Sequence, residues 1–193
     1  MKFNNVDNSI KKHNHKIFNL KAEKLVRKAS DAFLYLKDYN KALSLVKEVL
    51  SIDPAHTKSH LLKGDILLCM DNYKEALIAY ENGIYFNPSC AQAYGSKAGV
   101  LDMMNRQTEA LECCEKAFEY LNYNDKQLLL SLYDQKISLL TALKKYRKAQ
   151  QVLSEAVINL SDEDSSYLVS CYGSFIENND QKNVGNLLLK LVY

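Results

Sequence analysis

Five cysteines are the residues of this sequence best suited to redox chemistry or metal binding. They are Cys69, Cys90, Cys113, Cys114 and Cys171. Their number is odd and no two are spaced as C-x-x-C, so the pattern favours neither a disulfide framework nor a zinc ribbon. Reduced thiols in the cytoplasm fit the pattern better, and the sequence therefore predicts a cytoplasmic protein.

Two histidines, His56 and His60, are four residues apart, so both could face one metal ion on a helix. No third ligand lies within helical reach of them, and the sequence therefore predicts no metal site. It also contains no Gly-rich phosphate loop and no nucleophile elbow. We therefore predict a protein that is not an enzyme and that holds no cofactor.

The charges balance closely, with 25 Lys and Arg against 23 Asp and Glu. A net charge of +2 gives little attraction for a phosphate backbone, so no nucleic-acid partner is predicted. No apolar stretch approaches the roughly 20 residues that span a bilayer. The first ten residues also lack the apolar core of a secretory signal, so no membrane association is predicted.

The two ends of the chain differ in character. Residues 1–30 hold eight basic and two acidic side chains, and residues 1–22 are predicted to be a basic polar extension, disordered in part. This extension is either an arm for an acidic partner or an ordinary solvated terminus. The last residues predict an apolar helix that either covers the preceding repeat or forms a homo-oligomer contact. Its apolar residues are Leu187, Leu188, Leu189, Leu191 and Val192.

The strongest pattern is an internal repeat of 34 residues. Ala42, Ala76 and Ala110 are 34 residues apart, and Ala149 follows after a step of 39. The two prolines, at positions 54 and 88, also differ by 34. Such a period indicates one structural unit used several times, with five extra residues in the first helix of the fourth copy.

Each unit is predicted to contain two helices. Residues 57–70 and 74–86 carry apolar side chains at steps of three and four. Asn72 is expected to cap the second helix with Glu75 as its partner, and Pro88 ends that helix. A hairpin of two such helices cannot bury its own apolar face, so neighbouring hairpins must stack into a solenoid.

These residues resemble the tetratricopeptide repeat (TPR). The matching pattern is Tyr73, Glu75, Ala76, Tyr80, Asn87 and Pro88, with Tyr39, Ala42, Asp53 and Pro54 in the preceding copy. The resemblance implies an all-α, right-handed α-solenoid of antiparallel helix hairpins. It predicts one TPR domain over residues 23–193, with four repeats and a degenerate C-terminal capping hairpin. The repeats are 23–56, 57–90, 91–124 and 125–163, and the partial hairpin is 164–193.

The resemblance also implies that the first helices of the repeats line a concave groove that binds a partner. The predicted groove residues are Lys24, Arg27, Asp31, Lys58, Leu61, Asp65, Leu68, Gln92, Gly95, Gly99, Asp102 and Asp134, with Leu34, Ser131, Ser138 and Thr141 on the same stripe. Gly95 and Gly99 are one helical turn apart, so they either let a ligand backbone approach or make room for a bulky neighbour.

The two-carboxylate clamp by which some TPR proteins hold chaperone tails is not expected here. The matching positions include Leu62, Gln92 and Ser96, and no frame supplies its full set of cations. We therefore predict a protein-interaction adaptor or scaffold that binds a peptide or helix. The alternatives are a dedicated chaperone similar to those of type III secretion, and a self-associating structural protein.

Overall fold

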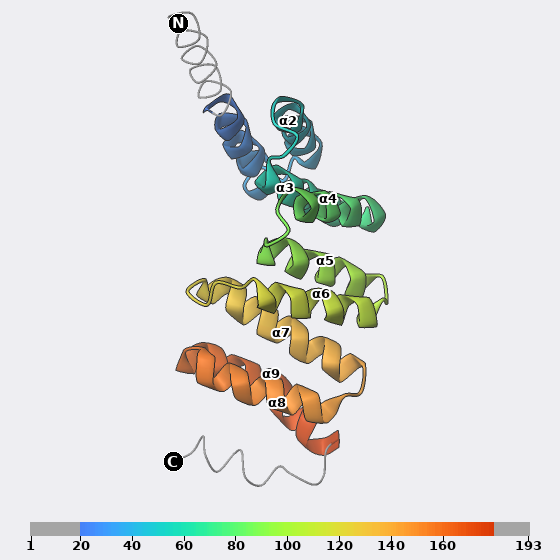
Figure 1. Cartoon of the computed structure of the whole chain (residues 1–193), viewed down its shortest axis with the longest axis vertical. Helices are drawn as coiled ribbons and strands as arrows, with labels where there is room; N and C mark the ends of the chain where they lie inside the picture. Colours follow the sequence, from blue (N-terminus) through green and yellow to red (C-terminus); the bar gives the residue numbers. More distant parts are fainter. Residues whose placement is uncertain (1–19, 180–193) are drawn as a thin grey trace, which may run out of the picture. The chain divides into compact units, whose positions relative to one another are not determined.

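A computed structural model describes residues 20–179, and every regular element within that range is a helix. The chain divides into two compact units between Pro88 and Ser89. Unit 1 contains a helix over residues 20–34, then α2 (Tyr39–Ile52), α3 (Thr57–Cys69) and α4 (Tyr73–Phe86) (Figure 1). Residues 1–19 and 180–193, with the predicted extension and apolar end helix, lie outside the described residues.

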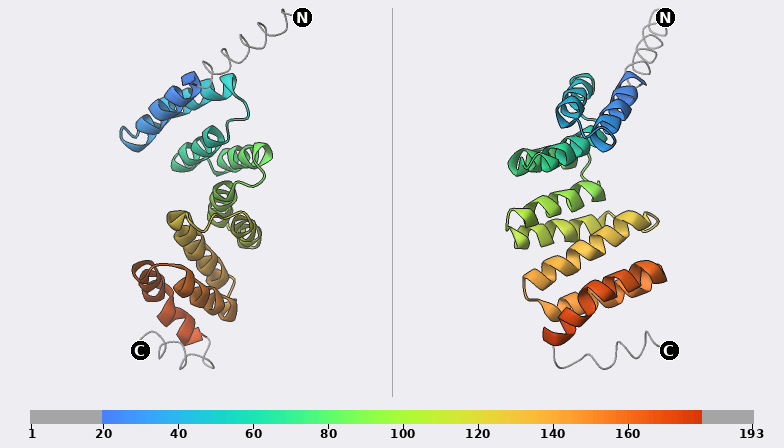
Figure 2. Two further views of the ribbon diagram at one scale, coloured as in Figure 1. Left: turned by 60° about the vertical axis from the view of Figure 1, so that its left-hand side comes forward. Right: turned by 180° about the vertical axis from the view of Figure 1, so that it is seen from behind.

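Unit 2 contains α5 (Ala91–Met103), α6 (Gln107–Glu119), α7 (Lys126–Ala142), α8 (Tyr146–Asn159) and α9 (Asp162–Asn179). Successive helices pack against each other as hairpins, α5 with α6 and α7 with α8, and α7 also contacts α5 and α9 (Figure 2). The predicted all-α class and its helix hairpins are confirmed. At 17 residues, α7 is longer than α3 and α5, which have 13 residues each.

The same turn joins the two helices of each hairpin. Lys37, Asp71, Asn105 and Lys144 all have φ between 54° and 59°, the left-handed region. The amide of the next residue bonds back to a carbonyl near the helix end, as when Asn72 N donates to Leu67 O at 2.9 Å. This bonding is the Schellman arrangement, which satisfies carbonyls that a helix end leaves free. It recurs at the period seen in the sequence, although none of the four residues is glycine.

Side chains cap the N-termini of some helices but not of others. The side chains of Asp38 and Asp125 accept hydrogen bonds from Lys41 N and Leu128 N, at 3.0 and 3.1 Å. Asn72 occupies the N-cap position of α4 but makes no side-chain cap bond there, so the predicted capping box is wrong. The Schellman bond uses the backbone of Asn72 instead, and it holds this turn in shape.

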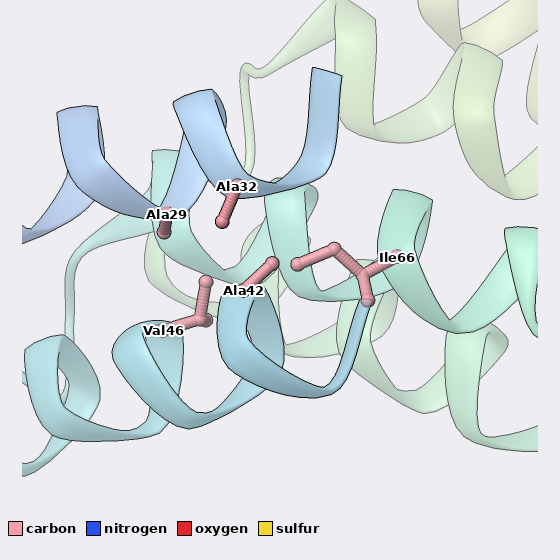
Figure 3. Close-up of a cluster of buried hydrophobic side chains, with 5 residues drawn as sticks. All are labelled: Ala29, Ala32, Ala42, Val46 and Ile66. Atoms are coloured by element: carbon pink, nitrogen blue, oxygen red, sulfur yellow. The ribbon is translucent and has the colours of Figure 1, made fainter. Parts of the chain in front are cut away.

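Small residues at the helix contacts build the core of unit 1. Ala29 and Ala32 of the first helix face Ala42 and Val46 of α2, and Ile66 of α3 closes the cluster (Figure 3). All five side chains are buried. Alanines on both sides of the contact let two helices approach closely, which explains why alanine recurs at the repeat period.

The core of unit 2 combines apolar packing with satisfied polar groups. Tyr133 of α7 packs on the ring of Phe118 at 5.1 Å between centroids. Its hydroxyl donates to Glu155 Oε1 at 3.1 Å and accepts from Asn159 Nδ2 at 2.9 Å, which anchors α7 to α8. Burial, the largest cause, raises the pKa of Tyr133 to about 12, so its phenol stays protonated and remains a hydrogen-bond donor.

Candidate protein-binding surface

The exposed side chains of the first helix form a regular stripe. Leu20, Lys24, Arg27, Asp31 and Leu34 follow at steps of three or four residues, and all five are exposed. That spacing places them on one face of the helix, opposite the packed alanines. We call these five residues the N-terminal stripe. The sequence predicted four of them, but not Leu20.

The N-terminal stripe combines free charges with exposed apolar ends. Leu20 and Leu34 are 59% and 53% exposed, although leucine side chains usually gain from burial. None of the carboxylates in the described part of the chain forms an ion pair with Lys24 or Arg27, whereas Lys21 on the same helix pairs with Glu48 at 3.3 Å. The stripe can therefore accept both acidic and apolar groups from another molecule.

On α3 the structure separates the four predicted groove residues. Lys58 is exposed and Leu68 is half-buried. Leu61 is only 6% exposed, so its predicted place on an open surface is wrong. Burying a leucine side chain contributes about 1.5–3 kcal/mol, and Leu61 contributes to the interior rather than to an open surface.

Asp65 of α3 also makes a contact inside unit 1 rather than facing an open surface. It is half-buried, and the Tyr80 hydroxyl of α4 donates to its Oδ1 at 2.6 Å. Burial raises the pKa of Asp65, and the hydrogen bond from Tyr80 opposes that rise in part. The ring of Tyr80 also fills the space above Gly64, where a Cβ would lie 2.4 Å from Cε1. Asp65 thus helps to fix α4 against α3.

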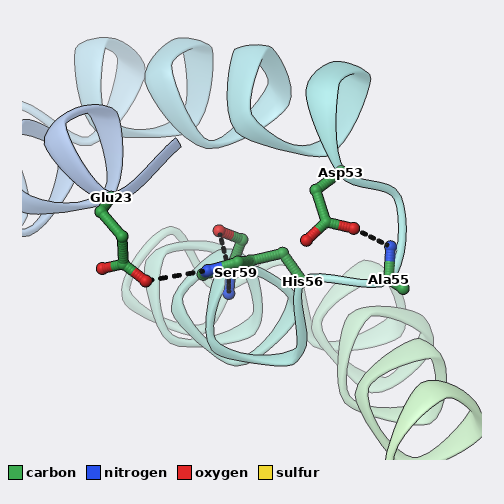
Figure 4. A network of polar contacts seen from close by, with 5 residues as sticks. All are labelled: Glu23, Asp53, Ala55, His56 and Ser59. Carbon is green, nitrogen blue, oxygen red and sulfur yellow. Dashed lines mark hydrogen bonds and ion pairs between the residues drawn. The ribbon is translucent and has the colours of Figure 1, made fainter. Parts of the chain in front are cut away.

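The two histidines have structural partners rather than a shared ligand. His56 Nδ1 accepts a hydrogen bond from Ser59 N at 3.2 Å and so caps α3, while His56 Nε2 lies 3.7 Å from Glu23 Oε1 (Figure 4). His60 Nε2 bonds with the carbonyl of Pro54 at 2.8 Å, and its ring stacks on Phe86. No group of three metal-ligating side chains occurs among residues 20–179.

On α5 the two glycines make room for α7. A Cβ at Gly95 would lie 2.9 Å from Leu132 Cδ2, and one at Gly99 would lie 3.3 Å from Gln135 Nε2. Gln135 also donates to the carbonyl of Gly95 at 3.3 Å. Gly95 is buried, which contradicts its prediction as a groove residue and supports the steric alternative.

Most of the remaining predicted residues of α5 and α7 reach the surface, whereas the Oγ1 atom of the half-buried Thr141 is buried. Gln92 and Ser131 are exposed, and Gly99, Asp102 and Asp134 are partly exposed. The hydroxyl of Tyr172, on α9, donates to Asp134 Oδ1 at 2.8 Å. Sequence reasoning missed Tyr172 because the residues of α9 were assigned to a degenerate capping hairpin, in which no groove residues were predicted.

Thiol chemistry is suppressed at the most buried cysteine. Burial raises the pKa of Cys114 to about 12, and its Sγ lies 3.7 Å from the carbonyl of Leu132. The cysteines within residues 20–179 are free thiols. In the same range, no helix has the length and apolar character needed to span a membrane.

Comparison with known proteins identifies the repeat. Residues 57–90, which comprise α3 and α4, match the tetratricopeptide repeat family. The chain contains a tetratricopeptide repeat over these residues. The matched segment is the copy with the fullest pattern, including Tyr73, Ala76, Tyr80 and Pro88.

One relative of this chain is a DnaJ protein P58IPK homolog B from Oryza sativa subsp. japonica. The two are 27% identical over 166 residues, which is 86% of this chain and 32% of that protein. The chain therefore spans about a third of the length of that relative.

Solved structures share the fold at low identity. A crystal structure of MamA has a TM-score of 0.64 at 18% identity, covering 77% of this chain and 83% of that one. The first TPR domain of Spaghetti (RPAP3), bound to an HSP90 peptide, has a TM-score of 0.57 at 17% identity, covering 64% and 94%. The Sgt2 TPR domain from Aspergillus fumigatus has a TM-score of 0.57 at 17% identity, covering 66% and 82%.

Proposed function

We propose that this TPR protein is a non-catalytic adaptor or scaffold of the cytoplasm that binds a peptide or helix of a partner protein. The binding surface in each unit is the exposed face of the leading helices, meaning residues 20–34, α3, α5, α7 and α9. The observation that carries the proposal is the N-terminal stripe, whose charges and leucines are open to solvent. Contiguous apolar and charged groups that no described element covers are typical of an interaction site.

Solved proteins with a similar fold support a role in protein binding. RPAP3 was solved with a peptide bound, and a CopN–Scc3 complex also shares the fold, with a TM-score of 0.51 at 21% identity. In the present chain, Lys24, Arg27 and Lys58 of unit 1 favour a partner segment with acidic side chains. The exposed leucines favour apolar side chains at its other positions.

The proposal is tested by reversing the charges of the N-terminal stripe. A partner that binds the full chain at saturable stoichiometry is first captured, and its affinity for the K24E/R27E variant is then measured by titration. This affinity should be at least about tenfold weaker than that for the original chain, a difference of about 1.4 kcal/mol. The matched control is Lys28→Glu, an exposed residue of the same helix outside the stripe, which should leave affinity within about twofold. Equal affinity for K24E/R27E and the original chain would rule out the stripe as a binding surface.

A dedicated chaperone role is the second candidate, and the match to a protein named as a DnaJ protein motivates it. Under that proposal, co-expression with this chain keeps an otherwise insoluble client in solution. An adaptor leaves the solubility of its partner unchanged, so partner solubility with and without this chain separates the two candidates.

A further inference from the structure

Asp134 is a carboxylate on the surface of unit 2 that has no cation beside it. It lies on α7 and is half-buried, and Tyr172 donates to its Oδ1 at 2.8 Å. Within residues 20–179 no Lys, Arg or His forms an ion pair with Asp134 and no group donates to its second oxygen, Oδ2. A partly desolvated charge without a partner is costly, so a cation that reaches Oδ2 from outside would be favoured.

Tyr172 contacts this carboxylate, and a second tyrosine lies on the same helix. Tyr167 and Tyr172 both belong to α9, and Tyr167 is 54% exposed. A hydrogen bond with Cys171 raises the pKa of Tyr167, and the charge of Asp134 raises it further, so this phenol lies within electrostatic reach of the carboxylate. Burial, followed by the bond to Asp134, raises the pKa of Tyr172. Both tyrosines therefore stay neutral beside Asp134 at physiological pH.

The helix that bonds to Asp134 carries no cation of its own. α9 has no Lys or Arg, and its first turn carries Asp162, Glu163 and Asp164. On α7, Lys136 lies over the ring of Phe118 at 4.8 Å, so its charge is engaged by that ring. This part of the surface consequently attracts positive charge.

We propose that Asp134, together with Tyr167 and Tyr172, binds an arginine or lysine side chain of the partner segment. The inference rests on the proposed function, and it adds which chemical group of the partner segment binds to unit 2. A guanidinium can donate to Oδ2 of Asp134 while its plane stacks on an exposed tyrosine ring. Arginine should therefore bind more tightly than lysine.

The test uses Nα-acetyl-arginine amide as the probe and the 15N-labelled full chain observed by NMR. The probe should bind with millimolar affinity and shift the amide signals of residues around Asp134 and Tyr167. The matched probe, Nα-acetyl-citrulline amide, has the same shape without the charge and should cause at most about a fifth of those shifts. Equal shifts from both probes, or shifts located elsewhere, would overturn the inference.

Four variants test which residues bind the arginine probe. Asp134→Asn keeps an acceptor for Tyr172 but loses the charge, and should weaken the arginine probe at least fivefold. Tyr167→Leu should weaken it about threefold, whereas Tyr167→Phe should not. Glu112→Gln removes an exposed carboxylate from α6 and should change nothing. An unchanged affinity in Asp134→Asn would overturn the inference, provided that circular dichroism shows the variant to be folded.

The chain's own basic residues are the competing occupant. If Lys11, Lys12 and Lys16 occupied this surface, replacing them together by Gln would tighten the arginine probe, and that result would overturn the assignment to a partner. Unchanged affinity supports it. If arginine fails to bind while K24E/R27E still abolishes partner capture, the inference fails alone. If the full chain binds no partner segment, the proposed function fails.

Discussion

Hydrogen bonds between side chains far apart in the sequence restrict which polar residues can bind a partner. Asp65 and Asp134 were both predicted as groove residues, and each accepts a hydrogen bond from a tyrosine, Tyr80 and Tyr172. Both side chains are half-buried, but the tyrosines that hold them differ. Burial raises the pKa of Asp65, which is held by the fully buried Tyr80, whereas Asp134 is held by the half-buried Tyr172. Of these two carboxylates, we therefore expect Asp134 rather than Asp65 to meet a ligand.

The stability of unit 1 should respond to the charge of Asp65. Because the folded pKa of this carboxyl is raised, its favourable contribution exists below the unfolded pKa and is lost as pH rises through the folded pKa. Asp65→Asn keeps an acceptor for Tyr80 and removes this pH-dependent loss. The free energy of unfolding of the variant, relative to the original chain, should rise between pH 4 and pH 7. Urea titrations across that range measure the free energy of unfolding of both proteins. If the value for the variant minus that for the original chain fell as pH rose, it would contradict a raised pKa at Asp65.

At the scale of the helices, close packing explains which small residues are needed. At Gly64 an added Cβ would meet three atoms of the buried Tyr80 ring, at 2.4 to 2.8 Å. The hydroxyl of that ring is also fixed by Asp65, so the ring cannot move aside freely. At Gly173, in contrast, the nearest side-chain atom is Val169 Cγ1 at 3.6 Å, which is an ordinary contact.

We therefore expect opposite effects from the same substitution at these two glycines. Gly64→Ala should lower the free energy of unfolding by about 1–3 kcal/mol, because it overpacks the contact between α3 and α4. Gly173→Ala should raise it by about 1 kcal/mol, because alanine is the better helix former and meets no obstruction. Thermal and urea unfolding of both variants give the comparison. Equal effects at the two positions would mean that packing against Tyr80 does not determine the choice of glycine.

At the scale of the whole molecule, the sequence predicted the helices well because the repeat period shows in many residues at once. Alanine, tyrosine and proline at steps of 34 placed the hairpins, and residues 57–70 and 74–86 lie within one residue of α3 and α4. The left-handed turn residues were not predicted, because Lys37 and Lys144 have no side-chain signal for that backbone.

The binding surface was less predictable than the fold. On α3, the side chains of buried Leu61 and exposed Lys58 point only a few tens of degrees apart around the helix axis. Sequence spacing does not resolve that difference in direction. The contact of Tyr172 with Asp134 joins residues 38 apart on different helices, so only coordinates could identify it. Leu20 was missed because it precedes the first recognisable repeat residue.

Site-specific photo-crosslinking of the full chain to its partner tests the central claim most directly. A benzoylphenylalanine replaces either an exposed residue of a leading helix, Leu34 or Gln92, or an exposed residue of a second helix, Lys47 or Glu112. We predict crosslinks to the partner from positions 34 and 92 and none from positions 47 and 112. Crosslinks from 47 and 112 without any from 34 and 92 would contradict binding by the leading helices.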